Sequence, residues 1–286
     1  MNRIAIVTDS NSGITPEKAK EMGIYLLPMP FLIDGKEYLD GVNLFPGEFY
    51  EYMENGAEVS TSQPSPESVM GLWDNLLKEY DEIVHIPMSS GLSGSCQTAK
   101  MLAEDYNGKV QVVNNQRISI TQVHSIMDAK NLVQAGKSAE EICRILESEG
   151  LEASIYITLV TLKYLKKGGR ITPAAAALGT MLRIKPVLQI QGEKLDAFSK
   201  VRTMSAAKRV MLDAIRSDLE KRFSGCKMRI AVAHTNNEAA AMEFKKEIEA
   251  EFPGYTDIIV NELSLSVACH IGAGSLAVAC SKIVEV

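Results

Sequence analysis

The sequence predicts an α/β protein of two domains, an N-terminal domain built on a parallel sheet and a C-terminal α+β domain with a mixed or antiparallel sheet. The chain has 286 residues, which is long for one domain and comfortable for two. Short apolar runs alternate with segments of helical period, and such alternation with short connections indicates a parallel sheet between helices. The pattern starts again around Leu151 to Tyr156, so we expect domains of residues 1–153 and 154–286.

In the first domain each expected element has a local reason. The run RIAIV predicts a buried strand that ends at a polar turn, and Thr15 caps the helix that follows. The prolines of IYLLPMPFLI confine this extended run to an edge or irregular strand. Ser65 and Pro66 open a helix that should run to about Tyr80. The other expected elements are the strand EIVHIPM, the helix CQTAKMLAEDY, the strand KVQVVN and a helix opened by the capping box Ser138-x-x-Glu141.

In the second domain the run KPVLQIQGEKLDAFSKVR predicts a hairpin, and therefore some antiparallel pairing. A long helix is expected from about Ser205 to Phe223. The other expected elements are the strand ASIYIT, helical segments in LVTLKYLKKGG and RITPAAAALGTMLR, the strand MRIAVAH, a helix, the strand DIIVNEL and the last run SLAVACSKIVEV.

The composition argues against several classes of protein. A net charge of −6 argues against a nucleic-acid partner and predicts at most transient contact with a membrane. The five cysteines show no C-x-x-C pairing, which is typical of buried thiols in a reducing cytosol, and the scattered histidines predict no metal site. No apolar run approaches the roughly 18–20 residues of a membrane span, and the N-terminal run is too short for a signal peptide. We therefore expect a cytoplasmic protein.

Hydroxyl-rich turns are the most informative feature of the first half. One follows RIAIVTDS, the second is STSQPS at Ser60–Ser65, and the third is SSGLSGS at Ser89–Ser95. Turns at the strand-to-helix junctions of a parallel sheet gather along one edge, where helix N-termini offer N–H groups to an anion. The hydroxyls that could bind a carboxylate or phosphate there belong to Thr61, Ser62, Ser93 and Ser95. The simpler alternative is that these residues only cap helices and form turns.

The segment Gly91-Leu92-Ser93-Gly94-Ser95 comes within one residue of the G-x-S-x-G elbow of serine hydrolases. In that alternative the chain is a hydrolase of acyl esters, Ser93 is its nucleophile, and His270 in SVACHIGAGS follows in the required chain order. Against it, Ser95 replaces the final glycine of the elbow and no HGGG-like oxyanion segment occurs upstream. The sequence favours an anion cradle and leaves the hydrolase as the alternative.

A cluster of cations lies in LKYLKKGGRITP, where Lys163, Lys166, Lys167 and Arg170 fall within eight residues. The lysines suit the C-terminal end of a helix. Arg170 falls beyond the glycine cap, and a guanidinium on a turn is a usual partner for a carboxylate or phosphate. The apolar segment TPAAAALGTMLRIKPVL that follows is either a core helix or the wall of an apolar pocket.

Together these motifs resemble the DegV family of bacterial fatty-acid-binding proteins, which includes the binding subunits of the fatty acid kinase. The resemblance covers the chain from Ile4 to about Val284, and the pairing of TSQPS with LKKGGRI is its most specific part. The motifs that carry it, in the family's order and spacing, are TDS, TSQPS, SSGLSGS, LKYLKKGGRI followed by IKP, and HIGAGS.

The resemblance implies a DegV-like fold that buries a long-chain fatty acid, such as palmitate, stearate or oleate, between the domains or inside the C-terminal one. By this resemblance Thr61 and Ser93 hold the carboxylate, His270 lies near the head group and Arg170 lies beside the entrance. The expected ligand-binding residues are Thr61, Ser62, Ser93, Gly94, His270 and Arg170.

The resemblance also implies a partner and the absence of catalysis. A separate ATP-dependent fatty acid kinase would phosphorylate the bound acid to an acyl phosphate for phospholipid synthesis. The chain itself would then be a carrier that needs no cofactor.

Two departures from the family pattern affect these expectations. Ala273 stands where the late turn usually has a proline, which predicts a looser turn. The segment Asn114–Gln122 lacks the usual Asp-Ser and a glycine, which affects the expected pocket shape and acyl-chain preference.

Overall fold

The computed structural model describes residues 2–178 and 184–285, with the side chains of residues 166–168 excepted. The chain forms two compact units. Unit 1 comprises the residues up to Gly150, a short return at Ser264–Ser266, and the last residues from Val284. Unit 2 comprises Leu151–Leu263 and Val267–Ile283.

Unit 1 contains the parallel sheet that the strand–helix alternation predicts. Its strand order is β2-β1-β6-β7, and all three neighbouring pairs are parallel. Val7 of β1 pairs with Tyr25 on one side and with His85 on the other. The strands are β1 (Ile4–Asp9), β2 (Tyr25–Leu27), β6 (Glu82–Ile86) and β7 (Val110–Val112).

Three helices of unit 1 begin at caps that can be read from the sequence. Thr15 Oγ1 accepts a hydrogen bond from Lys18 N–H at 3.2 Å, and Ser65 Oγ accepts one from Ser68 N–H at 3.1 Å. The capping box predicted at Ser138 is confirmed. The helices are α1 (Pro16–Met22), α2 (Pro46–Glu54), α3 (Pro66–Leu76), α4 (Ser95–Ala103), α5 (Ser119–Gln134) and α6 (Ala139–Ser148), with 3-10 turns η1 (Ser10–Ser12) and η2 (Glu104–Tyr106).

The extended run IYLLPMPFLI divides between two sheets. Its first part is β2, an edge strand, as the prolines predict. Its second part is the middle strand of a separate antiparallel sheet of order β4-β3-β5, so the prediction of an edge or irregular strand is wrong there. Pro30 is tolerated because it is the first residue of its strand. The strands are β3 (Pro30–Ile33), β4 (Lys36–Leu39) and β5 (Val59–Thr61).

Unit 2 is built on a six-stranded mixed sheet, as predicted. The strand order is β10-β9-β8-β13-β11-β12, and only the β11–β12 pair among the described strands of this sheet is parallel. The predicted hairpin is β9 paired with β10. The strands are β8 (Ala153–Thr158), β9 (Lys185–Ile190), β10 (Asp196–Val201), β11 (Met228–His234), β12 (Ile259–Glu262) and β13 (Leu276–Lys282).

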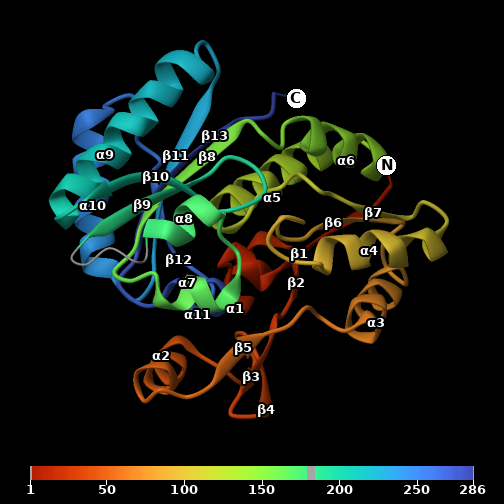
Figure 1. Ribbon diagram of the computed structural model, residues 1–286. Coiled ribbons are helices and arrows are strands. Elements are labelled where there is room, and N and C mark those ends of the chain that lie inside the picture. Colours follow the sequence, from red (N-terminus) through yellow and green to blue (C-terminus); the bar gives the residue numbers. More distant parts are fainter. Residues whose placement is uncertain (1, 179–183, 286) are drawn as a thin grey trace. The chain divides into compact units, whose positions relative to one another are not determined.

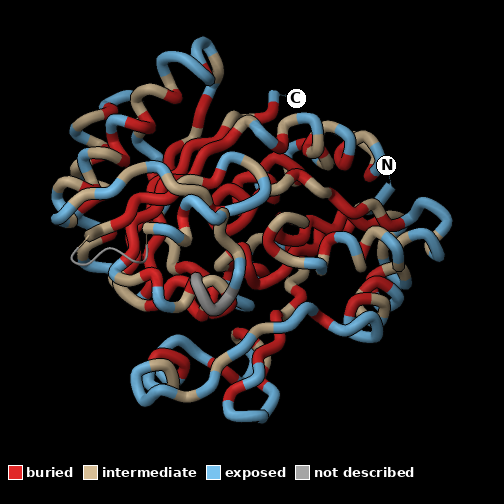
Figure 2. The backbone as a smooth tube through the Cα atoms, in the orientation of Figure 1, coloured by how far each residue is buried: buried red, intermediate tan, exposed pale blue. Residues whose placement is uncertain are grey.

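Helices α9 and α10 lie beside one another along the sheet of unit 2 (Figure 1). Ile215 of α9, Phe244 of α10 and Val278 of β13 are fully buried in one apolar cluster there. Strands β8, β11 and β13 form the buried interior of this unit in Figure 2, and every residue of β8 is buried. The helices of unit 2 are α7 (Lys163–Gly168), α8 (Pro173–Leu178), α9 (Met204–Ser217), α10 (Glu238–Glu251) and, beginning in the return to unit 1, α11 (Leu265–Ile271).

The helix expected to reach Phe223 is α-helical only to Ser217. It continues as a π-helical turn, η3 (Asp218–Arg222), closed by a 2.8 Å hydrogen bond from Phe223 N–H to the Asp218 carbonyl. The turn leaves Phe223 buried and the Asp218 carboxylate within 2.8 Å of Tyr156 Oη.

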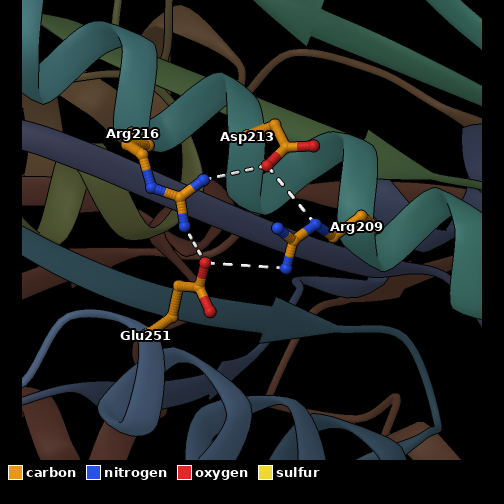
Figure 3. Close-up of polar contacts among 4 residues, drawn as sticks. All are labelled: Arg209, Asp213, Arg216 and Glu251. Atoms are coloured by element: carbon orange, nitrogen blue, oxygen red, sulfur yellow. Dashed lines mark hydrogen bonds and ion pairs between the residues drawn. The ribbon is translucent and has the colours of Figure 1, made fainter.

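An ion-pair network joins α9 to the end of α10 (Figure 3). Asp213 Oδ1 lies 2.9 Å from Arg216 Nη1 and 3.4 Å from Arg209 Nε, and Glu251 pairs with both arginines. These side chains are partly exposed, and exposed pairs contribute at most about 1 kcal/mol each. The network therefore reinforces the packing of the two helices.

Two short segments that the sequence analysis placed in the second domain are grouped with unit 1. The Asp40 carboxylate accepts hydrogen bonds from Ser10 Oγ at 2.9 Å and from the backbone N–H of Leu265. Val284 is buried in an apolar cluster with Ile6. Non-local contacts of this kind explain why a single cut in the sequence does not separate the units. None of the helices in the described part of the chain combines the length and apolar character that a membrane crossing requires.

Candidate ligand-binding site

Two of the three hydroxyl-rich turns lie at the carboxyl edge of the parallel sheet, as predicted. They follow β1 and β6, which are neighbours: Thr8 pairs with Ile86. Asp9 joins the turns, because its Oδ2 accepts a hydrogen bond from Met88 N–H at 2.8 Å. The edge where parallel strands end is the usual ligand-binding edge of such a sheet.

The third turn reaches this edge by another route. Thr61 is the last residue of β5, which belongs to the antiparallel sheet, so the prediction that STSQPS follows a strand of the parallel sheet is wrong. Gln63 nevertheless contacts the neighbouring turn: its Nε2 lies 3.2 Å from Thr98 Oγ1, and its Oε1 lies 3.1 Å from where a Cβ on Gly94 would stand. Unit 1 therefore brings STSQPS and SSGLSGS together.

The Ser93 hydroxyl accepts a hydrogen bond within its own turn, and its proton remains available for donation to a ligand. Its Oγ accepts a hydrogen bond from Ser95 N–H at 3.2 Å, and its own N–H donates to the Ser89 carbonyl at 3.2 Å. A hydroxyl that accepts a bond in this way can still donate one to an anion. Thr61 and Ser93 are partly exposed, Ser62 and Gly94 are exposed, and Gly94 is the N-cap of α4.

The Ser95 hydroxyl is not on the exposed side of the turn. Its Oγ is buried, and the residue lines a small cavity inside unit 1. Ser95 is therefore a poor candidate for a ligand donor, contrary to the sequence analysis. The turn exposes Ser93 partly and buries the hydroxyl of Ser95 two residues later.

The nucleophile alternative gains no support from unit 1. The hydrogen bond that the structure gives to Ser93 Oγ comes from a backbone amide. The nearby strand histidine, His85, makes no hydrogen bond with a described residue through either ring nitrogen. A serine nucleophile needs a neighbouring base that accepts its proton. Neither the amide of Ser95 nor His85 accepts a hydrogen bond from Ser93.

The segment Asn114–Gln122, which the sequence analysis noted as a departure from the family pattern, is hydrogen-bonded to the turn SSGLSGS, called the serine turn below. The carbonyl of buried Arg117 accepts a hydrogen bond from Ser89 N–H at 2.8 Å. Gln116 and Ser119 have positive φ angles of 57° and 55°, which non-glycine residues seldom adopt. At the start of α5, Gln122 Nε2 donates to Asp9 Oδ1 at 3.2 Å. No sequence signal had pointed to these supporting contacts.

Unit 2 brings together the other two predicted residues, Arg170 and His270. Arg170 follows Gly169, which ends α7 in the left-handed conformation. His270 lies in the last turn of α11. Burial and, secondarily, the positive charge of Arg170 lower the pKa of His270 to about 4. The imidazole is therefore neutral at pH 7 and carries one N–H donor.

The HIGAGS turn packs closely against the motif that contains the cations. A Cβ on Gly272 would lie 2.7 Å from Tyr164 Cε2, and one on Gly274 would lie 2.8 Å from Val160 Cγ2. Both glycines have positive φ angles, 76° and 83°. Two motifs that are separate in the sequence therefore pack together.

Thr235 makes hydrogen bonds with the HIGAGS turn, in which Ala273 lies. Thr235 Oγ1 donates to the Gly272 carbonyl at 2.7 Å and accepts from Ser275 N–H at 2.9 Å. Its backbone carbonyl accepts from Gly274 N–H at 2.7 Å. The polar run TNN directly after the buried strand β11 is the sequence signal that could have identified Thr235.

Part of the predicted site lies outside the described residues. This applies to residues 179–183 of the apolar segment, and to the side chains of Lys166 and Lys167. Within the described part of the chain, no group of three or more His, Cys, Asp or Glu residues is placed to hold a metal ion. Thr61, Ser62, Ser93 and Gly94 belong to unit 1, and Arg170 and His270 to unit 2.

Comparisons with known proteins identify relatives over almost the whole chain. The family model described as "Uncharacterised protein, DegV family" matches residues 3–282. A DegV domain-containing protein of Deinococcus radiodurans is 32% identical, over 96% of this chain and 97% of the relative. A structure described as fatty acid binding of a DegV family protein from Thermus thermophilus is 31% identical, with a TM-score of 0.90 over 98% of this chain and 99% of that one. DegV of Bacillus subtilis, described as a fatty acid binding protein, is 27% identical, with a TM-score of 0.87 over 99% and 100%.

Proposed function

The chain belongs to the DegV family, and from this premise we propose that it binds a long-chain fatty acid and presents the carboxyl group to an ATP-dependent fatty acid kinase. The observation that carries the proposal is the pair of hydroxyl-rich turns, Thr61 to Ser65 and Ser89 to Ser95, brought together at the carboxyl edge of a parallel sheet. The fatty acid binding described for the relatives from Thermus thermophilus and Bacillus subtilis supports the choice of ligand.

The donors suit a carboxylate that must stay reactive. Thr61, Ser62 and Ser93 are neutral hydroxyl donors, and His270 is neutral at pH 7. Such groups orient a carboxylate without neutralising it, so its oxygen remains able to attack a phosphoryl group. We assign Thr61 and Ser93 to the carboxylate, His270 to the vicinity of the head group, and the exposed Ser62 and Gly94 to the rim of the cradle.

The acyl tail supplies most of the affinity. Burial of one methylene contributes about 0.8 kcal/mol, so a dozen contribute on the order of 10 kcal/mol before the cost of association. Each hydrogen bond to the carboxylate adds about 1.5–3 kcal/mol. Tail burial therefore decides whether the acid binds, and the hydroxyls decide where its carboxyl group lies.

The product of the kinase step would be an acyl phosphate used in phospholipid synthesis, with this chain as a carrier that has no catalysis and no cofactor of its own. We assign the carrier to the cytoplasm. Its cysteines are not joined in disulfides in the described part of the chain, which suits a reducing compartment.

Calorimetric titration tests the proposal directly. We expect delipidated protein to bind oleate or palmitate at one site, and to bind the alcohol of the same chain length more weakly, because the alcohol lacks the charged acceptor. No binding of any long-chain acid would contradict the carrier. Labelling of Ser93 by a fluorophosphonate would favour the hydrolase instead.

Arg170 allows the kinase step to be tested separately. We expect Arg170→Ala to bind the acid normally and to slow acyl-phosphate formation at limiting kinase, because the guanidinium lies beyond the end of α7. Lys246→Ala, which removes an exposed cation of α10 in the same unit, is the control. Equal rates for Arg170→Ala and the wild type would remove this role.

A further inference from the structure

A small cavity inside unit 1 lies directly behind the serine turn. Its polar lining comes from four side chains and its apolar lining from five. The lining residues are Asp9, His85, Ser95 and Thr98, with Leu27, Pro64, Val69, Pro87 and Ala99. The cavity has room for about one water molecule.

His85 is the most unusual member of this lining. The residue is 2% exposed, and neither ring nitrogen makes a hydrogen bond with a described residue. Its aromatic neighbour Trp73, with ring centroids 5.6 Å apart, does not satisfy it, because the indole N–H also makes no hydrogen bond. Burial lowers the pKa of His85 to about 3, so the ring is neutral and has one donor and one acceptor. Buried polar atoms of this kind are nearly always paired with protein or with ordered water.

The Ser95 hydroxyl is a second polar group at this cavity without a hydrogen-bond partner among the described residues, although its Oγ is buried. A third polar group, Asp9, is close to saturated at Oδ1, which accepts from Asn11 and Gln122, whereas Oδ2 accepts one bond, from Met88 N–H. A carboxylate oxygen can accept a further bond.

We propose that this cavity is a binding site for one water molecule, which bridges the imidazole of His85 to the hydroxyl of Ser95. Water fits because it both donates and accepts, as a neutral imidazole and a hydroxyl require, and because it needs two to four polar partners. Asp9 Oδ2 is its third partner. A larger ligand does not fit the volume.

The water has a consequence for the proposed ligand site, and this step rests on the proposed function. Ser95 is the first residue of α4, and its N–H donates to Ser93 Oγ. By holding Ser95, the water fixes the start of the helix and the hydroxyl assigned to the carboxylate. His85 thus acts as a positioning residue, which reaches Ser93 through the water and Ser95.

The site itself is tested by a crystal structure of the wild type at a resolution that shows ordered water. We expect a fully occupied peak at hydrogen-bond distance, about 2.7–3.2 Å, from a ring nitrogen of His85 and from Ser95 Oγ. A well-ordered cavity without this peak would overturn the proposal. The experiment needs no fatty acid, so failure of the proposed function would not affect its outcome.

Amide hydrogen exchange of the acid-free protein tests the positioning role. His85→Phe keeps a flat ring and removes both nitrogens, and Ser95→Ala removes the other end of the bridge. We expect exchange at Ser95 to Thr98 to quicken roughly tenfold in each variant, while the amides of α6 exchange at the wild-type rate. Unchanged exchange at Ser95 to Thr98, or an equal increase in α6, would contradict selective positioning. Ser95→Ala keeps the test valid if His85→Phe fails to fold.

Discussion

At the residue scale, we assign the Ser93 hydroxyl to orienting a carboxylate, and the hydrogen bonding of this side chain supports that assignment. The backbone amide that donates to its Oγ fixes the hydroxyl, and the structure gives it no hydrogen bond to a base. A side chain in this position is suited to orienting a carboxylate.

Ser93→Ala should therefore affect phosphoryl transfer more than binding. We expect acid affinity to fall by no more than about tenfold, the loss of one hydrogen bond, and acyl-phosphate formation at saturating acid to fall further. Titration and a coupled kinase assay measure the two quantities. Ser148→Ala, at an exposed serine of α6, is the control. Equal losses in affinity and rate would show that the head-group contact serves affinity alone.

The lowered pKa of buried His85 predicts how the free energy of unfolding changes with pH. Its pKa is about 3 in the folded protein and near 6.5 when unfolded, so between these values only the unfolded chain binds the proton. Stability should thus fall as the pH drops below 6.5, with a contribution from His85 of up to about 1.4 kcal/mol per pH unit. His85→Gln should remove this part of the slope in denaturant titrations from pH 7 to pH 4. Parallel profiles for the variant and the wild type would contradict the neutral buried imidazole.

At the scale of elements, the HIGAGS turn packs against the start of α7. Gly272→Ala must strain the backbone at a φ of 76° and place a methyl group 2.7 Å from Tyr164. We expect a loss of about 2–4 kcal/mol in the free energy of unfolding, by thermal or chemical denaturation. Gly225→Ala, with a φ of 78° and nothing within 4 Å of the new Cβ, measures the backbone strain alone. Equal losses in the two variants would show that the contact with Tyr164 is unimportant.

Asp40 links the return segment at Leu265 to the rest of unit 1. Burial, opposed by hydrogen bonds from Ser10 and Leu265 and aided by the charge of Asp9, raises the pKa of Asp40 to about 6. Between pH 3.8 and 6 the folded state keeps a proton that the unfolded state releases, so this group makes the protein less stable as the pH rises through that window.

Asp40→Asn imitates the protonated carboxyl and cannot titrate. We expect the stability of the variant, relative to the wild type, to increase between pH 4.5 and pH 7 in denaturant titrations. A relative stability that does not increase over this range would contradict the raised pKa of Asp40. His85→Gln, with the opposite sign of change, serves as the comparison.

The elements that the sequence predicts are those whose local signals agree. Apolar runs mark β1, β6 and β11, and Ser65 and Ser138 mark the starts of α3 and α6. Helix α5 was missed because its buried face is largely polar, including Gln122 and His124, which conceals the helical period of apolar residues. Helix α2 follows Phe45, which makes no side-chain cap bond, so the usual signal for a helix start is absent.

At the scale of the whole molecule, the sequence predicts the two kinds of sheet and most of the candidate site. Thr61, Ser93, Arg170 and His270 stand out as hydroxyls, a cation and a histidine in turn-rich motifs. Their support is non-local and could not be predicted: Thr235 holds the HIGAGS turn through contacts 37 to 40 residues away in sequence. The return of Ser264–Ser266 to unit 1 could not be predicted either, because it depends on contacts that are distant in sequence.

The most direct test of the carrier is native mass spectrometry of the freshly purified protein, repeated after denaturation. We predict one fatty acid per chain in the native spectrum, lost on denaturation and identified by its mass. That mass would identify the cargo. A bare protein that also fails to take up added long-chain acids would contradict the carrier and make Ser93 a candidate nucleophile again.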